Sequence, residues 1–463
     1  MTQLFATIVC IAGILWLFVA DRDASLQVSK ALWIPTVWLL IIGSRGVSTW
    51  LQLNASVSLA QQYTEGSPLD AAVYGALIVG GALVLNHRSS QVRNFLRSNV
   101  PILIFLAYCA LSIVWSETPF IAMKRWSKSI GDLVMIMVVL TDAHPLPAIK
   151  RLFARGAFLL LPLSVLFIKC FPNMGSAYSP EDMTVLYLGV TSTKNMLGMI
   201  SMIFGLVSLW SFMGAFEDRK MPHRLRHLFV HALMIGTALW LIVKADSMTS
   251  LSCLFLAGTV LVLSSQRWVV RWPKSLHAIV WSAIALPVGA LFISTMGTLV
   301  HSLGRNSTLT GRTAIWRAVL LQHTNPLVGT GFESFWIGSR LQTVWNLSVH
   351  GIQEAHNGYL ELYLNLGLVG LCLLGVLIVT GYRRAIVSFR RDPDEGRIRL
   401  AFLTAALIFS LTEAGFRMLS PIWLVFLLAI SDMHSGSQAK EHANSQEPSW
   451  ARAPQPKRVR ILQ

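Results

Sequence analysis

Thirteen apolar segments recur along the 463-residue chain, and most approach the roughly 20 residues that a helix needs to cross a bilayer. Each is expected to be helical, because a backbone in lipid must satisfy its own hydrogen bonds. The segments are 4–20, 31–47, 69–86, 99–115, 129–141, 152–170, 195–214, 227–243, 249–265, 276–296, 359–381, 399–414 and 417–432. The second and fifth are short, so twelve spans also fit. The sequence therefore predicts an all-α polytopic integral membrane protein with 12 or 13 transmembrane helices over residues 1–432.

The composition supports this class. Charged residues make up 13% of the chain and hydrophobic residues 54%, whereas a soluble chain is about a quarter charged. This excludes an ordinary soluble enzyme, a disordered protein and a coiled coil. The formal net charge of +16 does not indicate a nucleic-acid partner, because the basic residues form short clusters between apolar segments and no nucleic-acid-reading motif accompanies them. The five cysteines lack metal-ligand spacing, so no zinc site is expected.

Lysine and arginine are concentrated in alternate connections, which predicts that those connections are cytoplasmic. The charges that define this side are Arg88, Arg93, Arg97, Lys150, Arg151, Arg155, Arg219, Lys220, Arg224, Arg226, Arg267, Arg271, Lys274, Arg383, Arg384, Arg390, Arg391, Arg397 and Arg399. The polar tail 433–463 ends in basic residues, and we expect it to be disordered and cytoplasmic. With thirteen spans the N-terminus then lies outside.

The opposite connections are longer and richer in Trp, Gly, Ser and Thr. They are 48–68, 116–128, 171–194 and the largest, 297–358. Long connections often carry function, so we expect the functional site on this outer side. The largest is expected to contain short amphipathic helices, one of them over 312–322 with Thr310 as its N-cap and Arg312 in its first turn. Ile315, Trp316, Val319 and Leu320 would face the membrane interface.

The same connection holds three motifs in a fixed order. They read Gly311-Arg312-Thr313-Ala314-Ile315-Trp316, Pro326-Leu327-Val328-Gly329-Thr330-Gly331 and His356-Asn357-Gly358-Tyr359-Leu360. Gly329 and Gly331 permit a tight turn or a close approach to a ligand. Two earlier motifs are Leu111-Ser112-Ile113-Val114-Trp115-Ser116 and Thr193-Lys194-Asn195-Met196-Leu197-Gly198. As an ordered set over about residues 100–430, they resemble the O-antigen ligase and Wzy-type polymerase superfamily of bacterial surface-polysaccharide assembly, and most closely ExoQ-type exopolysaccharide polymerases.

The resemblance implies a GT-C-like membrane glycosyltransferase in the bacterial inner membrane, with its active site facing the periplasm. Such enzymes take a glycan from undecaprenyl pyrophosphate and pass it to another lipid-linked repeat unit or to lipid A–core. A flippase and a chain-length regulator are implied partners. The family's essential histidine matches His356, and its essential arginines match Arg312 and Arg125.

The chemistry of the outer connections agrees with that expectation. A lipid pyrophosphate is already an activated leaving group, which needs neutralisation of its charge rather than a proton. Arginine suits this, because its planar group binds phosphate in a bidentate manner and stays charged. The expected pyrophosphate ligands are Arg125, Lys194, Arg312 and Arg317. No Asp-x-Asp motif lies in these connections, so we expect a metal-independent reaction without a cofactor.

The attacking sugar hydroxyl needs a base, and His356 is the expected one. Glu354 or Asn357 would orient its ring. Trp316 and Trp336 are candidates for stacking on sugar. Direct attack on the anomeric carbon, opposite the leaving pyrophosphate, predicts inversion of configuration.

Three alternatives remain open from the sequence. An O-antigen ligase would differ from a polymerase only in its acceptor. A lipid-linked oligosaccharide flippase or other transporter would carry internal repeats and charges near the middle of its spans. We find no convincing repeat, and charges avoid the span centres, which disfavours transport. A purely structural membrane partner would leave the clustered outer arginines and histidine unexplained.

Overall fold

The structure is a computed structural model. It describes residues 2–21, 28–52, 66–179, 183–272, 274–295, 308–347 and 352–432. The tail 433–463, for which we predict disorder, and residues 297–307 and 348–351 of the largest outer connection lie outside this set.

The described chain is helical apart from one short antiparallel hairpin, β1 (Ser176–Tyr178) with β2 (Val185–Tyr187). The elements of the N-terminal half are α1 (Thr2–Ala20), η1 (Lys30–Leu32), α2 (Trp33–Ile42), α3 (Val47–Trp50), α5 (Pro68–Asn86), α6 (Ser89–Ser98), α7 (Val100–Leu111), η2 (Ser112–Trp115), α8 (Pro119–Leu140), α9 (Pro145–Cys170), α10 (Pro172–Gly175) and α11 (Lys194–Glu217). Those that follow are α12 (Arg224–Lys244), α13 (Met248–Ser264), α14 (Arg267–Arg271), α15 (Lys274–Thr295), α16 (Thr308–Leu320), α17 (Gly338–Leu347), α18 (Gly358–Arg391), α19 (Pro393–Thr412) and α20 (Pro421–Ile430).

The predicted all-α polytopic class is confirmed. Every one of the thirteen apolar segments coincides with a helix. Among the described residues, six helices are long and apolar enough to cross a bilayer alone, namely α1, α5, α9, α11, α12 and α18. The pair of α6 with the helix over 100–115, bent by 82°, makes a seventh if the two are counted as one broken span rather than as a re-entrant loop. The prediction of 12 or 13 spans therefore exceeds what length and composition support, because helices such as α2 and α20 are short.

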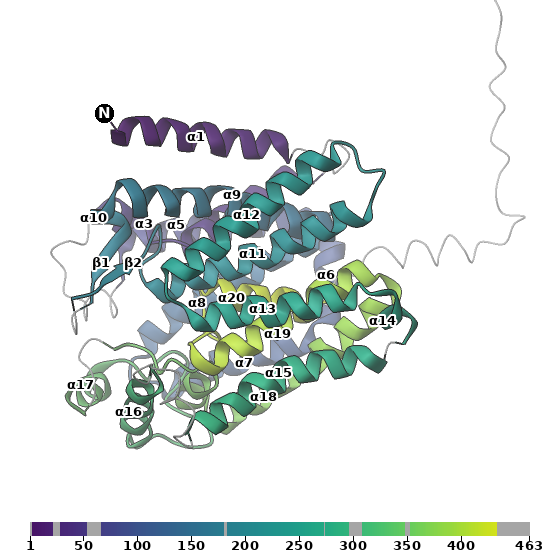
Figure 1. Cartoon of the computed structure of the whole chain (residues 1–463). Helices are drawn as coiled ribbons and strands as arrows, with labels where there is room; N and C mark the ends of the chain where they lie inside the picture. Colours follow the sequence, from purple (N-terminus) through teal and green to yellow (C-terminus); the bar gives the residue numbers. More distant parts are fainter. Residues whose placement is uncertain are drawn as a thin grey trace, which may run out of the picture.

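The helices lie roughly side by side, so the connections collect at two opposite ends (Figure 1). The hairpin, α3, α10, α16 and α17 gather at one end, and α6 and α14 at the other. The basic connections meet at the second end. There Lys150 Nζ lies 3.0 Å from Asp394 Oδ2, and Arg384 Nη1 donates to Asn99 Oδ1 at 2.8 Å. The predicted alternation of basic and outer connections thus corresponds to two separate ends, which we call the basic end and the outer end.

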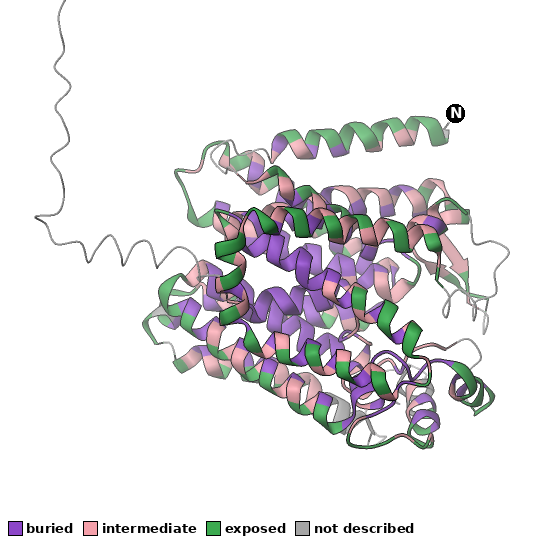
Figure 2. Cartoon of the chain, turned by 180° about the vertical axis from the view of Figure 1, so that it is seen from behind, coloured by how far each residue is buried: buried purple, intermediate pink, exposed green. Residues whose placement is uncertain are grey.

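The start of α1 lies at the outer end, where Gln3 Nε2 donates to Cys170 O at 2.8 Å. Most of α1 is exposed, whereas the middle helices form the buried centre (Figure 2). That centre includes nearly all of α20 and most of α19. A largely exposed apolar α1 is typical of a helix that faces lipid.

One charged residue breaks the expectation that charges avoid span centres. Asp132 lies midway along α8 and is 1% exposed. Its carboxylate accepts hydrogen bonds from Trp38 Nε1 at 2.9 Å and from the Leu419 backbone N–H at 3.0 Å. Since both bonds hold neighbouring segments together, the carboxylate serves the packing of α2, α8 and the connection before α20.

The motif Pro326–Gly331 packs against a break in α18. Gly367 has a non-helical backbone with φ of +65°, and the Leu368 and Val369 N–H groups bond to Pro326 O and Leu327 O. A Cβ on Gly367 would lie 2.2 Å from Leu327 O, and one on Gly329 2.5 Å from the backbone of Asn365. The close approach at Gly329 is therefore to the protein's own backbone, and the predicted approach to a ligand stays a prediction.

The largest outer connection is a small folded unit with its own core. Ile315, Val319, Trp336 and Leu341 pack together there with residues of α17 and α18. The predicted helix over 312–322 begins earlier, at Thr308, so Thr310 is not its N-cap and Arg312 lies in its second turn. Its apolar face covers this core instead of the membrane interface.

Candidate functional site

Glu413 is the centre of a charged cluster at the outer end. It directly follows α19 and is 6% exposed. Its carboxylate accepts from Arg312 Nη2 at 2.6 Å, lies 3.2 Å from His356 Nδ1 and accepts from Asn195 Nδ2 at 3.1 Å. These residues come from α16, α11 and the segment before α18, so one carboxylate joins three segments that are distant in sequence. The structure thus brings the predicted pair Arg312 and His356 onto a shared partner.

The cluster continues through a second carboxylate and a second arginine. Glu354 Oε1 lies 3.1 Å from His356 Nδ1, and Glu354 Oε2 lies 3.4 Å from Arg417 Nη1. Arg417 also contacts Glu333 Oε2 at 3.3 Å. Cations and carboxylates therefore alternate across the site.

The backbone around His356 is held in an uncommon conformation. His356 has a φ of +48°, which is costly for a residue other than glycine. Asn357 follows as the N-cap of α18, accepting from the Tyr359 and Leu360 N–H groups at 3.0 Å and donating to Leu411 O. Asn357 thus fixes where the helix begins, and it positions His356 through the backbone rather than by touching its ring.

Two buried contacts hold the preceding residue, Ala355. Trp316 Nε1 donates to Ala355 O at 2.8 Å. The Ala355 N–H donates to Glu361, whose carboxylate also accepts from Trp336 Nε1 at 2.9 Å. These bonds tie α16, α18 and the core of the outer unit to the segment that carries Glu354 and His356.

The two carboxylates control the charge of His356. Burial alone would lower the pKa of the imidazole, but its hydrogen bonds to Glu354 and Glu413 and their negative charges raise it to about 10. Burial would likewise raise the pKa of Glu354, but the bond from His356 and the charges of His356, Arg417 and Arg312 hold it below its usual range. At neutral pH His356 is therefore an imidazolium ion. A protonated ring favours a role for His356 as a source of positive charge over its predicted role as a base.

The other predicted phosphate ligands are placed differently. Arg125 lies on α8 rather than in a loop, because that helix begins ten residues before the predicted span. It is 6% exposed and donates to the backbone oxygen of Glu333, so it holds the 329–336 turn. Lys194, beside Asn195, lies 3.8 Å from Asp246 at the edge of the cluster. Arg317 is exposed on α16, one and a half turns beyond Arg312.

The two candidate tryptophans both make structural hydrogen bonds. Trp336 is 2% exposed and is enclosed in the core of the outer unit, so it offers no face to a sugar in this arrangement. Trp316 is half-buried, and its indole N–H is occupied by Ala355 O.

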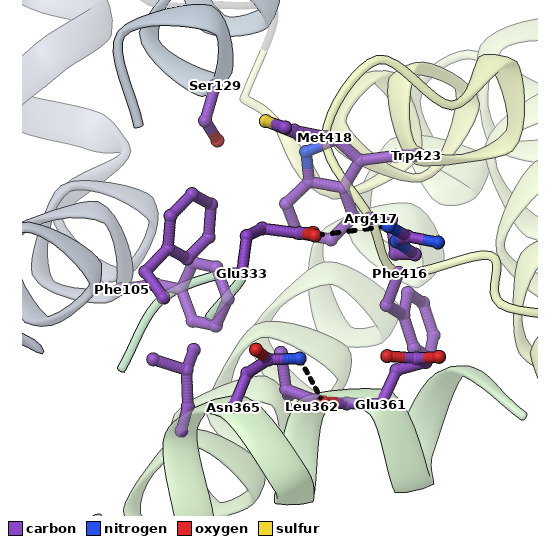
Figure 3. Close-up of a pocket in the computed structure, with 12 residues that line it drawn as sticks. Phe105, Ser129, Glu333, Glu361, Leu362, Asn365, Phe416, Arg417, Met418 and Trp423 are labelled. Carbon is purple, nitrogen blue, oxygen red and sulfur yellow. Dashed lines mark hydrogen bonds and ion pairs between the residues drawn. The ribbon is translucent and has the colours of Figure 1, made fainter. Parts of the chain in front are cut away.

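A small cavity lies beneath the cluster, with room for about one water molecule. Figure 3 shows Glu333 and Arg417 paired across it, with Glu361 and Asn365 of α18 below and Phe105 of α7 to one side. A glycan does not fit inside it. A ligand larger than water can therefore reach the cluster only at its outer surface, where His356 and Glu354 are 26% and 35% exposed at their side chains.

The same side chains offer ligand atoms for a metal. One atom each from Glu354, His356 and Glu413 lie within 4.8 Å of one another, and carboxylate and imidazole are common ligands of divalent ions. Arg312 and Arg417 already neutralise these carboxylates at 2.6 Å and 3.4 Å. The two arginines therefore occupy the electrostatic role that a metal ion would take.

Glu413 and Arg417 were missed by the sequence reasoning. Both fell within predicted spans, 399–414 and 417–432, whereas residues 413–420 form a non-helical connection. A signal was present, since an ionisable residue within an apolar segment marks a functional site by default. Asn195 belongs to a quoted motif, but nothing in the sequence paired it with Glu413.

No family model matches the chain. Among curated proteins it is similar to "Exopolysaccharide production protein ExoQ" of Rhizobium meliloti (strain 1021). The two are 24% identical over 325 residues, which cover 66% of this chain and 69% of the relative. This distant relationship supports the predicted ExoQ-like resemblance.

Proposed function

We propose that the chain is a membrane glycosyltransferase that polymerises undecaprenyl-pyrophosphate-linked repeat units into an exopolysaccharide at the outer face of the inner membrane. The observation that carries this proposal is the sharing of Glu413 by Arg312 and His356 at the outer end. The relative's name favours a polymer-forming role over transfer to lipid A–core.

In this mechanism Arg312, Arg417 and the His356 imidazolium, which balance the charges of Glu413, Glu354 and Glu333, turn part of their contacts to the diphosphate of the donor. Lys194 adds charge at the edge. The acceptor oxygen attacks the anomeric carbon, the bond from that carbon to the phosphate oxygen breaks, and its electron pair leaves with the lipid diphosphate. One displacement of this kind inverts the configuration and requires no cofactor.

The proton of the acceptor hydroxyl goes to a carboxylate, and Glu354 is the more exposed candidate. A weak carboxylate base suffices where the sugar develops positive charge before the new bond forms, as in inverting glycosidases. His356, which was predicted to be the base, instead supplies positive charge because it is protonated.

Complementation tests this proposal in cells that lack their own exopolysaccharide polymerase. The wild-type chain should restore long polymer, whereas Arg312→Ala should lose at least about 100-fold, as removal of one electrostatic group at a transition state does. Arg317→Ala is the matched control on the same helix and should retain polymer. Equal activity of both variants at wild-type protein levels would contradict the proposal.

A further inference from the structure

A second cluster of ligating side chains lies near the basic end. His227 and His231 are one turn apart on α12, on the same helix face, and Asp21 directly follows α1. His227 Nδ1 and His231 Nε2 lie 3.1 Å and 3.2 Å from the same oxygen, Asp21 Oδ1. Both histidines are 5% exposed. The proposed mechanism uses none of these three residues.

The spacing of these atoms fits a metal ion. In a four-coordinate site with bonds of 2.0–2.1 Å, neighbouring ligand atoms are about 3.3 Å apart. The two nitrogen–oxygen distances to Asp21 Oδ1 are close to this ligand-to-ligand distance. One ligand atom from each of the three residues lies within 4.8 Å of the others. Two imidazoles and one carboxylate form a donor set that suits Zn²⁺ and its neighbours better than Mg²⁺ or Ca²⁺.

We propose that Asp21, His227 and His231 form a zinc-class metal site that fastens the end of α1 to α12, with water as the fourth ligand. Without such a link α1 is weakly held, since most of it is exposed and its main packing partners among the described elements are α9 and α12 (Figures 1 and 2). A metal bond between Asp21 and α12 would fix the last turn of α1 against the bundle.

A neighbouring cation weakens but does not prevent binding. Arg151 Nη1 lies 3.4 Å from the backbone oxygen of Asp21, so its charge is close to the site. It contacts the carbonyl and leaves the Asp21 carboxylate to the two imidazoles. The alternative is a metal-free network in which the His227 and His231 rings both donate hydrogen bonds to the Asp21 carboxylate. The experiment below distinguishes this network from a metal site.

The site is distant from the candidate active site. From His231 to Lys244, the last residue of α12, is about 20 Å along the helix, and only beyond it does Asp246 meet Lys194. Binding at Asp21 can therefore be measured without reference to polymer formation.

The test uses the full-length protein in detergent micelles, purified without a polyhistidine tag and stripped with a chelator. Isothermal titration with Zn²⁺ should give one site per chain that His231→Gln and Asp21→Asn weaken at least about 10-fold. His223→Asn, an exposed histidine just before α12, is the matched control and should bind normally. His356→Gln should also bind normally, which excludes the outer cluster.

Co²⁺ gives a second readout on the unaltered protein, so the test does not depend on whether a variant folds. The visible bands of four-coordinate Co²⁺ should appear with one equivalent and disappear on addition of Zn²⁺. Absence of these bands together with no saturable Zn²⁺ binding would overturn the site. Binding that persists unchanged in both Asp21→Asn and His231→Gln would overturn it as well.

Discussion

Replacing Glu413 by glutamine probes the electrostatics of the cluster, because the shape is kept and one negative charge is lost. The pKa of His356 is raised to about 10 from 6.5, which corresponds to about 4 to 5 kcal/mol in favour of the charged ring. The carboxylates of Glu354 and Glu413 both contribute to this rise in the pKa of His356. Glu413→Gln should therefore remove about 2 kcal/mol and lower the pKa of His356 by about 1 to 2 pH units.

Histidine-selective NMR of the protein in nanodiscs can follow this change, with the His356→Gln spectrum identifying the resonance. Glu117→Gln is the matched control, because Glu117 pairs with Arg340 at the outer end and is 59% exposed. It should leave the titration of His356 unchanged. A wild-type His356 that titrates near 6.5, or a pKa that Glu413→Gln does not lower, would refute the reasoning.

The same shift predicts how stability depends on pH. A group whose pKa is higher in the folded than in the unfolded state stabilises the fold fully below the unfolded value. For His356 that contribution is complete below about pH 6.5 and is lost as the pH rises through about 10. The thermal midpoint of the wild type should fall over this window more than that of His356→Gln, and parallel curves would contradict the assignment.

Further predictions concern activity, packing and sidedness. His356→Ala should lower polymer yield about 10²- to 10³-fold with protein level retained, and normal chain length would remove His356 from the mechanism. Activity should persist in excess EDTA, and complete loss there would show that a metal replaces the arginines. Gly367→Ala should destabilise the fold by more than about 2 kcal/mol. Gly375→Ala is the control, because a Cβ there would have no neighbour within 4 Å. Equal denaturation midpoints of the two variants would contradict the close packing of Gly367 against Leu327. A cysteine at exposed Ser339, in a cysteine-free background, should react with an impermeant reagent from the periplasm, and labelling only after lysis would invert the topology.

The helical bundle could be predicted because each apolar segment by itself indicates a helix. The residues at which the helices begin and end were harder to predict. The α8 helix begins at Pro119, but Lys124, Arg125 and Lys128 in its first half hid it from a reading based on hydropathy. The break at Gly367 was also hidden, since it arises from the turn at Gly329, which lies far away in the chain.

The candidate site was only half predictable. Motifs located Arg312, Glu354 and His356, but their meeting point is Glu413, which is 101 residues from Arg312 and 57 from His356. The raised pKa of His356 depends on the same tertiary contact, so its charge could not be judged from the sequence. Trp336 was selected as an aromatic residue in an outer loop, and only the fold shows that it is enclosed.

The central claim is that this charged cluster transfers glycan from a lipid diphosphate. Its most direct test is to incubate the purified protein in nanodiscs with an undecaprenyl-pyrophosphate-linked repeat unit and to measure both chain length and released undecaprenyl pyrophosphate. The account predicts carrier-linked chains of several repeats, released carrier in proportion to the bonds formed, and neither product with Arg312→Ala. Intact substrate with the wild-type protein, or elongation that Arg312→Ala leaves unchanged, would contradict it.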